Sequence, residues 1–303
     1  MAIRRTAILT AARHAGSLSS APARTSRHQS ELGAWEVVSR DPDRRLRDHV
    51  ARFCGYREQG DRPLRRRELP STDVVVVLSF GPSIDVSDPT AGAALVRRTS
   101  FVAGLDPRPS TTEHDGRQLG LQLDLTPLGA FAFLGVPPGE LAGTVLDLEE
   151  VLGRHGPLLV ERLHEAPGWE SRFELLERTI LERVEAGRPA SPDVAWAWRR
   201  LRETDGRLPI GELARGLHCS RRHLTARFRE QVGLPPKTFA RLLRFDRAAR
   251  RLRADGAPRL AEIAFQCGYS DQAHFNRDFR EFSGWTPTEL VARVLPGGGL
   301  AGA

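Results

Sequence analysis

The chain has 303 residues, is 40% hydrophobic and 27% charged, and has a net charge of +7 at neutral pH. This length is enough for two ordinary domains, and the apolar fraction excludes a wholly disordered protein. No run of about 18 apolar residues occurs, so the sequence predicts no transmembrane helix. The cysteines Cys54, Cys219 and Cys267 lie too far apart for a disulfide framework or a paired metal motif, which favours a reducing compartment.

Charge is distributed unevenly along the chain. Residues 1–30 contain five arginines and no acid, and we expect them to form a disordered basic tail. Residues 31–190 contain 20 arginines and 26 acids, whereas residues 191–303 contain 19 arginines, one lysine and 12 acids. The net charge therefore changes from −6 to +8, which predicts that the C-terminal third binds a polyanion. The one lysine of the chain is Lys237.

Residues 31–187 predict a β-rich domain that ends in helices. The β-branched run at 73–80 is typical of a buried strand and is followed by Gly81-Pro82. Residues 118–125 alternate strictly between leucine and other residues, which predicts a strand with one apolar face. Helix-spaced apolar residues then follow at 146–152, 157–166 and 169–184.

The segment 185–193 contains two prolines and a glycine, and we place an interdomain linker at 188–192. Ser191 and Pro192 suit the N-cap and the first position of the next helix. The sequence then predicts a helical domain at 193–292 and a flexible tail at 293–303. The expected helices are 193–204, 209–217, 220–232, 236–254, 259–267, 270–282 and a short one that begins at Pro287.

An internal repeat relates residues 212–236 to residues 262–287. Each copy has a short helix, a turn, a serine that we expect to cap the next helix, and a second helix with apolar residues four apart. This is the layout of a helix-turn-helix, although an ordinary helical hairpin with a charged outer face would explain a single copy. Two matching copies favour the first interpretation. The matched pairs are Glu212/Glu262, Ala214/Ala264 and Ser220/Ser270 at an offset of 50, then Leu224/Phe275, Phe228/Phe279, Gly233/Gly284 and Pro236/Pro287 at 51.

The outer face of each second helix is basic and polar, and we expect it to enter the major groove of DNA. Arginine reads guanine through two acceptors, and asparagine or glutamine can pair similarly with adenine. The helix at 236–254 is expected to act as a rigid spacer that holds the two units about one DNA turn apart, roughly 34 Å. The predicted DNA-binding residues are Arg221, Arg222, Thr225, Ala226 and Arg229 in the first copy, and Gln272, Asn276, Arg277 and Arg280 in the second, with Ser220 and Ser270 as helix caps.

The second copy and the helix before it contain a specific set of residues: Ile263-Ala264, Cys267-Gly268-Tyr269-Ser270-Asp271, His274-Phe275, Arg277, Phe279, Gly284 and Thr286-Pro287. With them, residues 193–290 resemble the DNA-binding domain of the AraC family of bacterial transcription regulators. Upstream, the chain contains Leu69-Pro70, the Val74–Phe80 strand, Phe101-Val-Ala-Gly104, and Pro127-Leu-Gly-Ala130 leading to Leu134-Gly135. With them, residues 44–166 are similar to a cupin-like N-terminal domain of uncharacterised function.

The resemblance implies an α+β protein of two domains: a β-rich cupin-like domain with helices, followed by an all-α double helix-turn-helix. It further implies a one-component regulator that binds operator DNA in the cytoplasm, at the nucleoid. Its other implied partners are RNA polymerase, an unidentified small-molecule effector and a second copy of the chain.

The sequence predicts no enzyme, no catalytic residue, no metal and no cofactor. Cupin-like folds that hold a metal use a His-X-His pair, and the chain has none. His114 lies in Thr-Glu-His-Asp-Gly, which predicts a polar turn. We expect Cys219 and Cys267 to fill the helix-turn-helix cores. Two alternatives stay open: a cupin-type or DNA-repair enzyme with a DNA-binding appendage, and a nucleoid-type binder without sequence preference.

Overall fold

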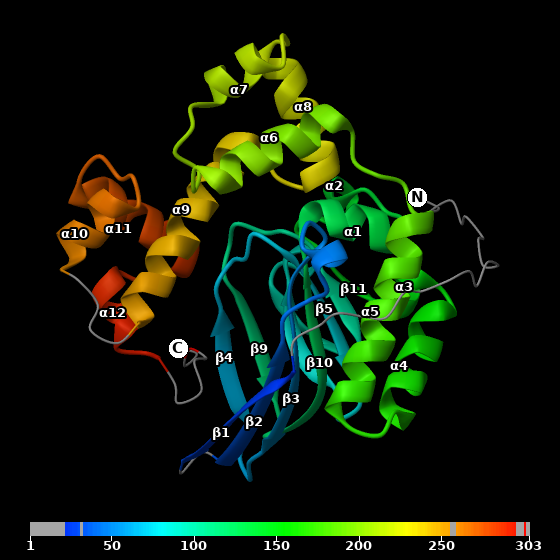
Figure 1. Cartoon of the computed structure of the whole chain (residues 1–303). Coiled ribbons are helices and arrows are strands. Elements are labelled where there is room, and N and C mark those ends of the chain that lie inside the picture. Colours follow the sequence, from blue (N-terminus) through cyan, green and yellow to red (C-terminus); the bar gives the residue numbers. More distant parts are fainter. Residues whose placement is uncertain (1–21, 31–32, 255–258, 295–299, 301–303) are drawn as a thin grey trace.

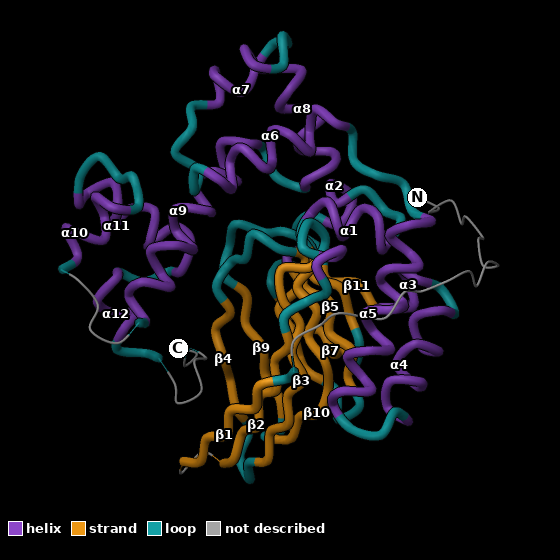
Figure 2. The backbone as a smooth tube through the Cα atoms, in the orientation of Figure 1, coloured by secondary structure: helices purple, strands orange, loops and turns teal. Residues whose placement is uncertain are grey.

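The computed structural model describes residues 22–30, 33–254, 259–294 and 300. They form a β-rich N-terminal domain with helices along one side, and an all-helical C-terminal domain (Figure 1). Figure 2 shows that the strands are gathered in the N-terminal domain. The predicted fold class is therefore confirmed.

The described strands form two antiparallel sheets. The seven-stranded sheet has the order β1-β2-β3-β10-β5-β8-β11, and the four-stranded sheet has the order β4-β9-β6-β7. The strands are β1 (Arg24–Ser30), β2 (Gly33–Arg40), β3 (Val50–Gln59), β4 (Leu64–Glu68), β5 (Val74–Ser79), β6 (Ile84–Asp88), β7 (Ala94–Arg98), β8 (Phe101–Ala103), β9 (Ser110–His114), β10 (Arg117–Leu125) and β11 (Val145–Asp147).

Strand β10 separates the main apolar core from a cavity between the two sheets. Its leucines Leu121, Leu123 and Leu125 are fully buried in the core, as the alternation along a strand requires. The residues between them point to the opposite face, where Gln122 and Asp124 line the cavity. The alternating pattern in the sequence therefore places one face of β10 in the apolar core and the other face in the cavity.

Helices cover the core side of the larger sheet (Figure 1). One difference from the sequence prediction lies at the start of this region, where Val145–Asp147 pairs with β8 as a strand and the predicted helix at 146–152 begins only at Leu148. The helices are α1 (Pro127–Leu134), α2 (Pro138–Leu141), α3 (Leu148–Leu152), α4 (His155–Glu165) and α5 (Trp169–Ala186).

The expected basic tail needs a correction at residues 24–30. They form β1, which pairs in register with β2 although six of its seven residues are exposed. This strand is held by main-chain pairing and by ion pairs such as Arg27–Glu36, so it has no apolar alternation for a sequence pattern to detect. Residues 1–21 lie outside the described residues. In the expected C-terminal tail, Leu300 is buried, and its carbonyl accepts a 3.1 Å hydrogen bond from the Arg67 N–H.

The C-terminal helices follow the predicted ranges closely. None of the helices in the described part of the chain is long and apolar enough to cross a bilayer. They are α6 (Pro192–Glu203), α7 (Ile210–Gly216), α8 (Arg221–Val232), α9 (Pro236–Arg253), α10 (Leu260–Gln266), α11 (Gln272–Ser283) and α12 (Pro287–Val291).

Candidate nucleic-acid interface

Helices α7 and α8 form one helix-turn-helix unit, and α10 and α11 form the other. Each turn contains one residue with positive φ, His218 at 50° in the first unit and Gly268 at 79° in the second. Each recognition helix then ends at a left-handed glycine, Gly233 or Gly284. The two units therefore share a positive-φ residue in the turn and a C-terminal glycine, in addition to their two helices.

The recognition helices are capped by different residues. Ser220 caps α8, because its Oγ accepts a 3.1 Å hydrogen bond from the His223 N–H. The cap of α11 is Asp271, one residue after the predicted Ser270, and its Oδ1 accepts a 2.7 Å hydrogen bond from the His274 N–H. Ser270 instead donates its hydroxyl to the other Asp271 oxygen at 2.9 Å.

Each unit has an aromatic core against α9. Phe228 of α8 lies edge-on to Phe239 with 5.8 Å between ring centroids. In the second unit Phe279 lies 4.7 Å from Phe275 and 4.9 Å from Phe245. All five rings are fully buried, so both recognition helices are fixed on α9 by close packing.

Polar contacts also hold α9 to α11 and to the loop between α6 and α7. Arg241 donates to Asp278 at 2.7 Å and to Glu281 of α11, and the bond to Glu281 raises the pKa of Arg241. Arg244 donates to the Gly206 carbonyl at 2.8 Å. Arg247 pairs with Asp205. These contacts suit a rigid spacer, because they prevent rotation of α9 against its neighbours.

The predicted DNA-binding residues lie on the outer face of their helices. The exposed ones are Arg221, Arg222, Ala226, Arg229, Gln272, Arg277 and Arg280, and the half-buried ones are Thr225 and Asn276. The Arg221 guanidinium lies against Gly211 of α7, so close that a Cβ placed on this glycine would be 2.5 Å from the Arg221 Nη2.

The later cap of α11 changes how the two outer faces correspond. Helix α8 begins at Arg221 and α11 begins at Gln272, so all recognition-helix positions match at an offset of 51. Arg222 then matches Ala273, and Arg277 matches Ala226. The two arginines expected to read bases therefore differ in position: Arg222 lies on the first turn of α8, whereas Arg277 lies on the second turn of α11.

Sequence reasoning gave no sign of the contacts between the N-terminal domain and the two recognition helices. Helix α2 approaches the end of α8, where a Cβ built on Gly139 would lie 2.8 Å from the Arg229 carbonyl oxygen. In the other unit, Arg67 of β4 donates to the Ser283 carbonyl at 2.9 Å and lies 4.7 Å from the centre of the Trp285 ring. Both contacts join segments far apart in the sequence, so no local pattern predicts them.

A basic groove between the two units was also missed. Its volume is about 570 Å³, and it lies between the loop after α6, the first turns of α9 and the start of α11. The cations that line it are Arg207, Lys237, Arg241, Arg244 and Arg277. The one sequence feature that could have pointed to this groove is Lys237, because it is the single lysine of an arginine-rich chain.

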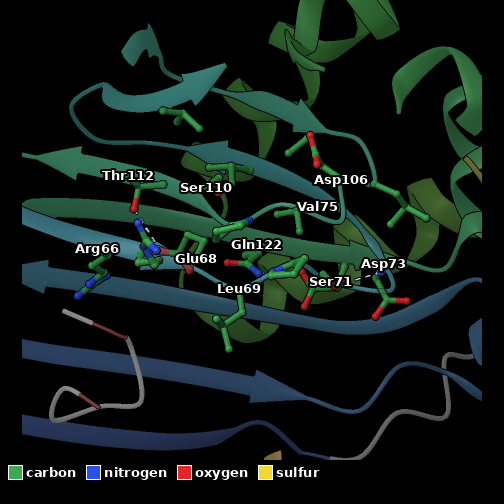
Figure 3. A pocket seen from close by; sticks show the side chains of 18 of the residues that line it. Arg66, Glu68, Leu69, Ser71, Asp73, Val75, Asp106, Ser110, Thr112 and Gln122 are labelled. Atoms are coloured by element: carbon green, nitrogen blue, oxygen red, sulfur yellow. Dashed lines mark hydrogen bonds between the residues drawn. The ribbon is translucent and has the colours of Figure 1, made fainter. Parts of the chain in front are cut away.

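The N-terminal domain contains a larger cavity of about 920 Å³ between its two sheets, which also reaches α9. Figure 3 shows Arg66, Ser110 and Thr112 on the walls from the smaller sheet, with Val75 and Gln122 from the larger one. One wall is apolar and belongs to a separate cluster of buried residues: Val77, Ile84, Val86, Phe101 and Val145.

Polar groups gather on the other walls of the cavity. His114 ends β9 and is buried rather than placed in the predicted polar turn, and burial lowers its pKa. Its Nε2 lies 3.5 Å from Glu58, which also accepts two hydrogen bonds from Arg66, at 2.7 and 3.0 Å. Asp73 also lines the cavity, and burial and the charge of Asp124 raise its pKa to about 7. Across the described residues, no three His, Cys, Asp or Glu side chains form a group that could hold a metal ion.

Comparison with known proteins identifies a helix-turn-helix domain at residues 213–293, which confirms the predicted domain type. The chain is 33% identical over 78 residues to the transcriptional activator RhaS of Escherichia coli, covering 26% of this chain and 28% of that protein. It is 38% identical over 77 residues to the F1 operon positive regulatory protein of Yersinia pestis, covering 25% of each. The chain thus matches about a quarter of the length of these curated relatives, both of which are regulators.

Solved structures with related arrangements include ToxT of Vibrio cholerae, with a TM-score of 0.47 and 13% identity over 79% of this chain and 97% of that one. Another is a transcriptional regulator from Chromobacterium violaceum that is described as having an AraC-type DNA-binding domain. It has a TM-score of 0.31 and 26% identity over 34% of this chain and 91% of that one.

Proposed function

We propose that this protein is a sequence-specific, DNA-binding transcription regulator of the AraC type. The observation that carries the proposal is a pair of helix-turn-helix units on one helix, each with exposed arginine on its recognition helix. Because α9 packs closely on both units, the two recognition helices would enter successive major grooves on one face of the duplex. The partner is operator DNA, and the protein would act at the nucleoid in the cytoplasm.

The two units would read different bases. In α8, Arg222 on the first turn would pair with guanine, and Ala226 would contact an apolar edge such as the thymine methyl. In α11, Asn276 would pair with adenine and Arg277 with guanine, one turn further along the helix. Arg229 and Arg280 lie later on each helix and would contact phosphate. Arg221 is held against α7 and would contribute positive charge near the backbone.

A binding measurement across a mutated operator library tests this assignment, with the parent duplex selected from random sequence by the full chain. Arg222→Ala and Arg277→Ala should each remove about 1–3 kcal/mol of base discrimination, at positions roughly 10 base pairs apart. Arg229→Ala and Arg280→Ala serve as matched controls, because loss of a phosphate contact should weaken all duplexes evenly. Uniform losses for Arg222→Ala and Arg277→Ala would refute direct readout.

The cavity between the two sheets suits a small-molecule effector with one apolar and one polar side. Its apolar wall contains Val86, and residues of α9 such as Leu243 also line it, so an occupant would contact the helix that holds both DNA-reading units. Val86→Phe would reduce the space for such a ligand. A reporter driven by the selected operator should then stop responding to growth conditions, while the affinity of purified protein for DNA stays unchanged. Loss of affinity without effector would contradict a sensing role.

RNA polymerase and a second copy of the chain complete the proposed partners. A regulator alters transcription by touching or excluding the polymerase, and a dimer would present two pairs of recognition helices. Sedimentation of the purified full chain, with and without the selected duplex, measures the second of these. A single chain per duplex at all protein concentrations would remove dimerisation from the proposal.

The nucleoid-type alternative is separated from regulation by competition with random DNA at physiological salt. A regulator should bind its selected site typically 10³-fold or more tightly than unrelated sequence, whereas a non-specific binder shows no such difference. For the enzyme alternative, the deciding measurement is metal content of purified protein, in which stoichiometric zinc or iron would count against regulation alone.

A further inference from the structure

The basic groove between the two helix-turn-helix units lies at the place where a bound duplex would pass from one unit to the other. Its walls are the loop that leads into α7, the first turns of α9 and the start of α11. Arg277 belongs both to this groove and to the exposed face of α11. The groove is therefore continuous with the predicted reading surface.

The cations of the groove outnumber its acids, and the acids are already engaged. Asp278 bonds to Arg241, and Asp271 accepts the His274 N–H, which lowers the pKa of Asp271. Lys237, by contrast, is exposed and has no ion pair with any described residue. Arg244 also keeps an unbonded Nε that is buried within the described structure. The groove thus carries more positive than negative charge, and Lys237 adds a cation that forms no ion pair within the described structure.

The chemistry of the groove suits a phosphate group. A lysine ammonium is a compact point charge that commonly binds phosphate. Helix α9 begins beside it at Pro236, and no side chain caps its N-terminus, so the helix dipole adds further positive potential. A neutral polar ligand would gain little from either feature.

The phosphate groups of a bound DNA duplex are the anions expected at this groove. When two recognition helices enter successive major grooves on one face of B-DNA, the minor groove between them faces the protein together with its two flanking backbones. Those phosphates would lie opposite the segment between the units. We propose that this groove binds phosphodiester groups of the operator between the two base-reading sites, with Lys237 as the main charge contact; the inference rests on the proposed DNA-binding function.

Salt dependence of binding provides the first test. Lys237→Gln should reduce the slope of log affinity against log salt by about 0.9, the contribution of one phosphate contact on B-DNA. The loss should be equal on the selected duplex and on a scrambled duplex, and Lys237→Arg should restore the slope. Arg154→Gln is the matched control, because Arg154 is exposed in the N-terminal domain, far from the groove. An unchanged slope for Lys237→Gln would overturn the proposal.

Replacing single DNA phosphates with uncharged methylphosphonates shows which phosphate Lys237 contacts. Methylphosphonate replacements placed one at a time between the two half-sites should weaken wild-type binding at one or two positions, and Lys237→Gln should show no further loss at those positions. Equal losses for both proteins at every position would overturn the proposal. Failure of the proposed function looks different, because it would remove the preference for the selected over the scrambled duplex and leave the salt slopes measurable.

The single lysine also permits a direct footprint on the full chain. An amine-acylating reagent modifies one side chain, Lys237, which peptide mass spectrometry separates from the N-terminal amine. Duplex DNA should slow this modification, and inorganic phosphate at matched ionic strength should not. Protection by inorganic phosphate but not by DNA would reassign the groove to a free anion and overturn the proposal, as would equal reactivity in all conditions.

Discussion

The two helix-turn-helix units have the same architecture, but the N-terminal domain contacts them by different means. Both contacts fall at equivalent points of the repeat, beside the glycines that end the recognition helices, Gly233 and Gly284. At the first, the main chain of α2 lies against the main chain of α8, and the Pro138 carbonyl oxygen would approach a Cβ on Gly233 to 3.1 Å. At the second, the guanidinium of Arg67 occupies the space beside Gly284.

The difference between the two contacts indicates which recognition helix is easier to separate from the N-terminal domain. The α8 contact is a backbone fit, which only a change of shape can open. The α11 contact depends on one long side chain, through a hydrogen bond and a cation–π contact. The contact at α11 can therefore be removed by truncating a single side chain, whereas the contact at α8 cannot.

The largest expected effect comes from the aromatic cores, which both units share. Phe228→Ala and Phe279→Ala should each lower the free energy of unfolding by about 3–5 kcal/mol, because each leaves a cavity in a closely packed site. Hydrogen exchange should then separate the units. Loss of protection should extend through α11 in Phe279→Ala, but remain partial in α8 of Phe228→Ala, where α2 still holds the helix end. Equal loss in both helices would contradict the comparison.

The backbone fit at α8 is tested by adding volume. In Gly139→Val the new side chain meets the carbonyl oxygens of Arg229 and Glu230 at less than 3 Å, and overpacking of this kind costs about 1–3 kcal/mol of stability. Chemical denaturation measures the loss. Glu140→Val is the control, since Glu140 is exposed on the same helix. A destabilisation as large in the control would show that valine in α2, rather than the clash, is responsible.

The side-chain contact at α11 is tested by Arg67→Ala. Removal of its hydrogen bond and ring contact should cost roughly 1–2 kcal/mol and should raise hydrogen exchange around Ser283–Trp285 without affecting α8. Arg65→Ala is the matched control, because Arg65 lies two residues away on β4 and is exposed. If exchange in α8 rises together with that in α11, the two contacts are not independent.

The smallest effect distinguishes the two caps by pH. The pKa of Asp271 is below its ordinary value, so its cap stabilises α11 at pH above about 4, the unfolded value, and the benefit is lost as pH falls through the folded pKa. Ser220 does not titrate, and Ser220→Ala should cost about 1 kcal/mol at every pH. Stability against pH for Asp271→Asn and Ser220→Ala checks this, and a pH-dependent effect of Ser220→Ala would contradict it.

The helices of the C-terminal domain could be predicted because their signals are local. Apolar residues four apart, capping residues and terminal glycines define α8 and α11 within a residue or two. The shift of the α11 cap from Ser270 to Asp271 escaped the repeat comparison, because both residues can cap a helix and both lie in the turn. Only the backbone shows which one precedes the first helical turn.

Other features could not be predicted because they depend on distant partners. Strand β1 is polar and obtains its structure from pairing with β2. The burial of His114 follows from packing of β9 beside β4, and the contact of Arg67 with Trp285 joins residues more than 200 positions apart. The predicted outer-face residues needed only helical phase, whereas the groove at Lys237 needed three segments brought together.

The apolar core has a consequence for how the molecule comes apart. One continuous cluster includes Leu105 and Leu141 of the N-terminal domain together with Phe228 and Leu234 of the C-terminal domain. A protease that cuts the exposed stretch at Arg188 and Pro189 would therefore leave two fragments that stay associated, because separation would expose apolar surface on both. Heat should likewise melt the two domains in one cooperative transition, even though the chain between them is a short, open loop.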